Sequence, residues 1–211
     1  MTFHGELVES EKKKKMSAAK RLKYENDGRI IWFKSTKANG FAWLSNFFPD
    51  VLPAAFNKLP DEIKACSGSF VVDGVKYRTV EHFFQSKKYS HMPEVEEDIR
   101  SAPTAAEAKK RNTRHKHAHP IDVKAWEGGK AEEMMEIAIF AKFSQNPPLL
   151  KALLETEGQD LREICDRSDS KWTGDMKHRG LLGEILIRVR KRLLREQKPK
   201  EAPPAVEEAP Q

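Results

Sequence analysis

Two segments with apolar residues at helical spacing constrain the fold of this chain most. Near the C-terminus, apolar side chains recur three and four positions apart, at Leu182, Ile185, Leu186, Val189 and Leu193. A second such run, between residues 130 and 143, contains Met134, Ile137, Ala138 and Ala141. This spacing gathers the apolar side chains on one face of a helix, and such a face has to be buried. We therefore predict two helices that pack in the core.

Strand signals lie in the N-terminal half. Ile30–Phe33 is a short run of β-branched and aromatic residues, which is typical of a buried strand. Phe70–Tyr77 contains two apolar runs around Asp73-Gly74, a pair that favours the two positive-φ positions of a tight hairpin turn. We predict a small antiparallel sheet here.

Helix starts follow further along the chain. Thr104 with Glu107 forms a capping-box pattern, and Asn146 followed by Pro147 is a second start signal. Strands and helices do not alternate as they do in βαβ units. The predicted fold class is therefore α+β, a helix-rich single domain packed on a small antiparallel sheet.

The ends of the chain differ in composition from its middle. Of the 211 residues, the first 28 carry two lysine-rich clusters and the last 15 are rich in Pro, Glu and Ala. We predict a disordered basic arm (1–28), one folded domain (29–196) and a disordered tail (197–211). No apolar run reaches the roughly 18 residues that a membrane-spanning helix needs. We expect no membrane association and a cytoplasmic or nuclear protein.

Metal and cofactor signals are weak. The chain has no GxGxxG or Walker loop, so it lacks the usual dinucleotide and P-loop signatures. Cys66 and Cys165 lie far apart, and the histidines of His115–His119 have no carboxylate or thiol nearby in the sequence. We expect no metal and no cofactor. The net charge of +6 favours an anionic partner, although a solvated basic surface is the alternative.

A helix predicted over Thr79–His91 carries an unusual polar stripe. At about 100° per residue, one narrow stripe contains Glu81, Gln85 and Lys88. The simpler interpretation is a solvent-exposed face that such pairs support weakly. The other interpretation is an acid, an amide and an amine arranged for chemistry.

Three tryptophan-containing segments offer partners for that stripe. They are polar or contain glycine, and they read AWLSNFFP with Asn46, AWEGGK with Trp126, and SDSKWTGD with Asp169 and Trp172. Each tryptophan alone is explained by packing. Tryptophans in polar segments are also suited to stacking on a nucleobase.

The ordered set of motifs resembles the NADAR superfamily. The resemblance is carried by LSNFFP, EHFFQSKK, the WExxK pattern from Trp126, the Lys142-Phe143 pair, DSKWTGD and LLGEIL, over roughly residues 31–193. It implies an N-glycosidase, a hydrolase that acts on ADP-ribosylated guanine or, in other branches, on early riboflavin-biosynthesis intermediates. One departure is that this chain has Trp172-Thr173-Gly174 where relatives have WG, and Gly180 where they have Asn.

The resemblance also implies roles for single residues. The family pattern EHxxQxxK corresponds to Glu81, His82, Gln85 and Lys88. In this hypothesis Lys88 attacks the sugar carbon C1 and forms an imine, while Glu81 moves protons. Burial must lower the pKa of Lys88, and an ionised Glu81 opposes that change unless it starts protonated. If Lys88 is not the nucleophile, a water activated by Glu81 is the alternative.

The remaining site residues are expected around the substrate. Asp169 is expected to orient the ribose hydroxyls or the lysine. Contacts to substrate are expected from Asn46, His82, Gln85, Trp126, Trp172, Arg114 and Arg179. Arg114 belongs to one candidate phosphate patch with Arg111, Lys116 and His117, and Arg179 forms another.

The favoured partner is ADP-ribosylated guanine in DNA or RNA, or as a free nucleotide. ADP-ribose is the expected product, and the chain is expected to act as a monomer. The positive net charge fits a substrate with a pyrophosphate better than it fits a riboflavin-biosynthesis intermediate. The riboflavin intermediate stays the alternative substrate. A nucleic-acid-binding module without catalysis is a second alternative.

Overall fold

The computed structural model describes residues 28–164, 171–175 and 177–197. Apart from Gly28 and Gln197, the predicted basic arm and tail lie outside these residues. The strands are β1 (Ile30–Phe33), β2 (Phe70–Val72), β3 (Val75–Tyr77) and β4 (Asp160–Glu163). The α-helices are α2 (Pro53–Phe56), α3 (Asp61–Lys64), α4 (Val80–Ser86), α5 (Pro93–Arg100), α6 (Ala105–Ala118), α7 (Val123–Ala125), α8 (Ala131–Ser144), α9 (Pro147–Glu155) and α10 (Leu181–Gln197). Shorter helical turns are η1 (Ala42–Leu44), η2 (Lys87–Tyr89) and η3 (Trp126–Lys130).

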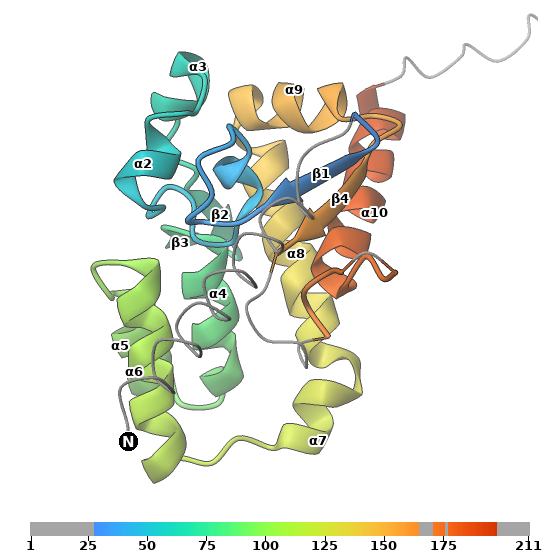
Figure 1. Ribbon diagram of the computed structural model, residues 1–211. Coiled ribbons are helices and arrows are strands. Elements are labelled where there is room, and N and C mark those ends of the chain that lie inside the picture. Colours follow the sequence, from blue (N-terminus) through green and yellow to red (C-terminus); the bar gives the residue numbers. More distant parts are fainter. Residues whose placement is uncertain (1–27, 165–170, 176, 198–211) are drawn as a thin grey trace, which may run out of the picture.

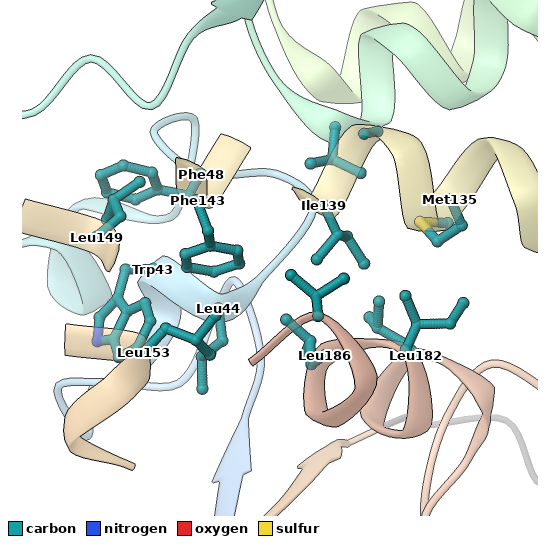
Figure 2. Packing of buried hydrophobic residues seen from close by; sticks show 14 of the residues in the cluster. Trp43, Leu44, Phe48, Met135, Ile139, Phe143, Leu149, Leu153, Leu182 and Leu186 are labelled. Carbon is teal, nitrogen blue, oxygen red and sulfur yellow. The ribbon is translucent and has the colours of Figure 1, made fainter. Parts of the chain in front are cut away.

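The main hydrophobic core surrounds α8, against which α4, α9 and α10 pack (Figure 1). Met135 and Ile139 of α8 point toward Leu182 and Leu186 of α10 (Figure 2). The C-terminal stripe is confirmed, because all five of its apolar side chains are buried in α10. No helix in the described part of the chain is long and apolar enough to cross a bilayer.

The stripe predicted on α8 is only partly correct. Ala138 and Ala141 are buried, but Ile137 is 36% exposed. The large buried side chains are instead Met135, Ile139 and Phe143. Since α4 and α10 both pack on α8, the buried surface of this helix is wider than one narrow stripe.

Two pairs of strands are present. The predicted hairpin is confirmed, because β2 pairs antiparallel with β3 and both turn residues, Asp73 and Gly74, have positive φ. β1, however, pairs in parallel with β4 rather than with the hairpin. The α+β class is confirmed, and β4 is a strand that the sequence analysis did not predict.

A second, smaller hydrophobic cluster joins η2, the turn that follows α4, to the α5–α6 pair. Its buried residues are Tyr89, Val95, Ile99, Ala102 and Ala108. Thr79 caps α4 and Thr104 caps α6, each by accepting a hydrogen bond from the backbone N–H three residues on. As a result α4 lies between α6 on one side and α8 on the other (Figure 1).

Candidate active site

The polar stripe of the predicted helix is buried and hydrogen-bonded to itself. Gln85 Nε2 donates to Glu81 Oε1 at 2.8 Å, and Lys88 Nζ donates to Gln85 Oε1 at 2.7 Å. Glu81 and Gln85 are each only 5% exposed, so the solvent-exposed face considered above is excluded. We call these three side chains the polar array. Its amide connects an acid to an amine.

Lys88 lies on η2, directly after α4, and its amine faces aromatic rings. Nζ is 5.1 Å from the centre of the Phe84 ring and 5.9 Å from that of Trp126. Burial lowers the pKa of Lys88 to about 8, although the nearby Glu81 carboxylate acts in the opposite direction. With that pKa, roughly a quarter of the amines are neutral near pH 7.5, and a neutral amine is what nucleophilic attack requires.

Three aromatic rings from distant parts of the sequence meet beside the polar array. The ring of Phe84 lies 5.3 Å from Trp126 and 5.3 Å from Trp172, centre to centre. Trp126 is buried, whereas Trp172 is half-buried. The structure therefore brings both predicted tryptophans to Phe84, whose ring also faces the Lys88 amine. The partly exposed ring of Trp172 gives a planar surface on which a base can stack.

The segment that carries Trp126 departs from regular helix. Asp122 caps α7, and the chain then forms the single π-type turn η3, where Gly129 has a φ of 127°. An ion pair between Glu127 and Lys171 connects this turn to the Trp172 segment. A π-type turn at this position is consistent with a functional site.

Asn46 reaches the site from the loop after η1. Its backbone carbonyl accepts from the Glu81 N–H at 3.1 Å, and its side-chain N–H lies 3.4 Å from Met135 Sδ. The side-chain oxygen of Asn46 has no hydrogen-bond partner among the described residues. Lys142 fixes this loop to α8, because its Nζ donates hydrogen bonds to the backbone carbonyls of Trp43 and Ser45.

Glu163 is a member of the site that the sequence analysis missed. It ends β4, next to the Trp172 segment, and its backbone carbonyl accepts from Gly174 N at 2.9 Å. Burial raises the pKa of the Glu163 carboxyl to about 7, and the negative charge of Glu81 raises it as well. Two carboxyl groups therefore share one electrostatic environment. A glutamate in an unpredicted strand gave no signal in the sequence.

His82 is placed in the interior and not toward a substrate. Its ring nitrogens lie 2.8 Å from Thr79 Oγ1 and 2.9 Å from the carbonyl of Ala102, and the residue is fully buried. Burial lowers the pKa of His82. Both ring nitrogens have partners in the protein, so His82 connects α4 to the turn before α6, and its predicted contact to substrate stays a prediction.

The predicted arginines are also occupied by the protein. Arg114 forms an ion pair with Glu107 on its own helix, and Arg179 forms one with Asp160 at the start of β4. Asp160 and Glu163 occupy opposite ends of that strand, so Arg179 is not grouped with the polar array. Asp169 lies outside the described residues. In the described part of the chain, no group of three His, Cys, Asp or Glu side chains is placed to hold a metal.

Gly180, the departure from the family pattern, packs tightly against the Trp172 segment. It has a φ of 78°, and a Cβ placed there would lie 2.5 Å from the carbonyl oxygen of Thr173. An asparagine therefore has no room at this position unless the neighbouring backbone moves.

Comparisons with known proteins agree with this fold. The family described as the NADAR domain matches residues 32–194. N-glycosidase YbiA from Shigella boydii is 35% identical over 126 residues, which make up 58% of this chain and 74% of that protein. The NMR structure of Escherichia coli YbiA has a TM-score of 0.61 and 26% identity, and the match covers 86% of this chain and 95% of that chain.

Two longer relatives match through part of their length. Riboflavin biosynthesis protein VVA0006 of Vibrio vulnificus is 28% identical over 78% of this chain, which spans 38% of that protein. The chloroplastic riboflavin biosynthesis protein PYRR of Zea mays is 30% identical over 73% of this chain, which spans 24% of that protein. The family match over residues 32–194 and the fold shared with YbiA lead to one conclusion: the chain belongs to the NADAR family.

Proposed function

We propose that this chain is an N-glycosidase that cleaves the bond between ribose C1 and a base nitrogen in ADP-ribosylated guanine. The observation that carries the proposal is the buried polar array, in which an amine with a lowered pKa is linked through an amide to a carboxylate. The relatives named N-glycosidase YbiA support the reaction class.

Lys88 is the proposed nucleophile. Its neutral nitrogen forms a bond to C1, the bond from C1 to the base nitrogen breaks, and the electron pair stays on the base nitrogen. The lysine nitrogen then loses one proton to Glu81. As the bond from C1 to the ring oxygen breaks, the second N–H proton passes to that oxygen, which gives an open-chain imine with a free hydroxyl. Water adds to the imine carbon, and the free sugar and the neutral lysine are released.

The two carboxyl groups divide the proton transfers in this proposal. With a pKa of about 7, Glu163 is partly protonated at neutral pH and can give a proton to the leaving base nitrogen. Glu81, linked to Lys88 through Gln85, accepts the proton that the lysine nitrogen loses. Glu81 does not have to start protonated, because burial lowers the pKa of Lys88 to about 8 despite the opposing negative charge of Glu81.

The aromatic side of the site is proposed to hold the base. Trp172 is half-buried and packs on Phe84, so its free surface can stack on guanine. The side-chain oxygen of Asn46, which has no partner among the described residues, can accept a hydrogen bond from the sugar or the base. Asp169 keeps the role that the resemblance implies, orientation of the ribose hydroxyls or the lysine.

A riboflavin-biosynthesis intermediate is the second candidate substrate. Two relatives are named riboflavin biosynthesis proteins, and they match most of this chain. The net charge of +6 favours the ADP-ribosyl compound, because a pyrophosphate and a nucleic-acid backbone carry more negative charge than a small intermediate.

One experiment tests both the reaction and the substrate. The protein is incubated with ADP-ribosylated guanine DNA and, separately, with riboflavin intermediates, and the released sugar is quantified. Borohydride added during turnover should trap a sugar on Lys88, visible by mass spectrometry as a modified peptide. Binding of nucleic acid without released sugar from either substrate would identify a non-catalytic binding module and contradict the proposal.

A further inference from the structure

The face of α6 that packs toward the polar array carries two lysines, one on either side of Asn112. Asn112 is buried, and its side-chain N–H lies 3.5 Å from the backbone carbonyl of Gln85, a member of the array. Lys109 and Lys116 stand three residues before and four residues after it. On a helix these three positions fall within an arc of about 60°, so both lysines rise from the face that Asn112 turns toward Gln85.

The electrostatic environment of Lys88 agrees with this placement. The positive charges of Lys109 and Lys116 both lower the pKa of Lys88, so both amines lie within electrostatic range of it. Lys109 also lowers the pKa of Glu163. Two lysines of one helix therefore lie within electrostatic range of the proposed reaction centre.

Both amines are also available to a ligand. Lys109 and Lys116 are exposed, and neither forms an ion pair with any residue that the structure describes. The other cations of α6 differ. Arg111 and Arg114 sit on the opposite side of the helix, with Arg114 about 140° from Lys109, and they pair with Asp98 and Glu107.

We propose that Lys109 and Lys116 form the site that binds the phosphate groups of the substrate. This inference deepens the proposed function by fixing the direction of the bound molecule: phosphates lie on α6, C1 at Lys88, and the base on Trp172. The chemistry fits, because a 5′-phosphate or diphosphate is carried by the same ribose ring whose C1 reacts. Lysines bind phosphates as flexible point charges.

The direct test measures binding of inorganic pyrophosphate by calorimetry, with no turnover required. In the double variant K109Q/K116Q, the Kd for pyrophosphate should rise roughly 10-fold, because two charge-assisted contacts are lost. The matched control is Lys110→Gln, the next residue of the same helix, which already lies near Glu107. It should bind pyrophosphate as tightly as the unsubstituted protein.

Substrate kinetics give the second readout. K109Q/K116Q should raise KM for the ADP-ribosyl substrate roughly 10-fold at a given pH and leave KM for the corresponding guanine riboside, which lacks phosphates, unchanged. The inference is overturned if the unsubstituted protein does not bind pyrophosphate, if Lys110→Gln weakens binding equally, or if the KM effect persists with the riboside. Lysine-dependent pyrophosphate binding with no released sugar would instead overturn the proposed function alone.

Discussion

Lys88 and Lys142 are two lysines in aromatic surroundings, and they illustrate different uses of the same side chain. Burial lowers the pKa of both, to about 8 for Lys88 and about 7 for Lys142. Lys142 is 1% exposed, and its Nζ lies 5.1 Å from the centre of the Phe143 ring. Lys88 is half-buried and contacts Gln85.

The partners of each amine account for the difference. A neutral lysine amine has two N–H groups, and Lys142 can use both on the carbonyls of Trp43 and Ser45. Among the described residues, Lys88 has one hydrogen-bond acceptor, the side-chain amide of Gln85, which in turn donates to the Glu81 carboxylate. A lowered pKa therefore does not identify a nucleophile on its own. The acceptors around the amine, and its access to solvent, distinguish a structural lysine from a reactive one.

The largest expected effect is the loss of turnover in Lys88→Met. Removing the nucleophile should lower kcat by about 10³-fold or more, since no other described amine adjoins the Glu81 carboxylate. The fold should persist, because Lys88 is half-buried and a methionine retains most of its apolar contacts. Sugar release and the thermal midpoint are measured together. Normal turnover by a folded Lys88→Met protein would rule out the lysine and favour a water activated by Glu81.

Lys142→Met should act on stability instead. The carbonyl of Trp43 would lose the hydrogen bond that Lys142 donates, at a cost of about 1–3 kcal/mol in the free energy of unfolding. Denaturant unfolding measures the change. At a temperature where the variant stays folded, kcat should be near that of the unsubstituted protein, and a loss as large as in Lys88→Met would contradict the separation of roles.

Because of Lys142, the free energy of unfolding should also increase as the pH rises. The pKa of Lys142 is about 10.5 in the unfolded chain and about 7 in the fold, so between these values the unfolded chain binds the proton more strongly. The resulting penalty on folding is full below pH 7 and is lost as pH rises toward 10.5. Between pH 7.5 and about 9.5, the free energy of unfolding should therefore rise more in the unsubstituted protein than in Lys142→Met.

The pH dependence of kcat/KM should be bell-shaped and centred near 7.5. The reactive form needs a neutral Lys88 and a protonated Glu163, whose pKa values are about 8 and about 7. Activity should fall about tenfold per pH unit well outside this range on either side. In Glu163→Gln the residual activity should instead rise with pH to a plateau, since only Lys88 still titrates. If the pH dependence of kcat/KM stayed bell-shaped in Glu163→Gln, Glu163 would be excluded as the proton donor.

The smallest expected effect concerns how neighbouring charges tune Lys88. Removing the charges of Lys109 and Lys116 stabilises protonated Lys88, and loss of Lys109 likewise raises the pKa of Glu163. The whole pH profile of K109Q/K116Q should therefore move slightly to higher pH. The pH dependence of stability that Lys142 causes should not change, because neither Lys109 nor Lys116 affects the pKa of Lys142.

The sequence predicted features that depend on neighbouring residues in the chain. Thr104 caps a helix, Asp73-Gly74 closes a hairpin, and the spacing of Glu81 and Lys88 forms one polar array. Each of these depends on residues at most seven positions apart, so backbone geometry alone decides them.

Features that depend on distant segments were not predicted. β4 is held by β1, which is 130 residues away in the register Ile30 to Asp160, and its own sequence has one buried apolar residue. Glu163 was missed together with its strand. The burial of Lys142 follows from a loop 97 residues earlier in the chain. Composition could not show which cations of α6 were already paired.

The close approach of Gly180 to Thr173 makes two departures from the family pattern a single coupled change. Thr173 is the additional residue between the tryptophan and the glycine, and its backbone occupies the space that a side chain at position 180 would need. Gain of the one and loss of the other are therefore epistatic. An engineer who places an asparagine at position 180 must therefore also make the Thr173 backbone give way, because a Cβ there would collide with it.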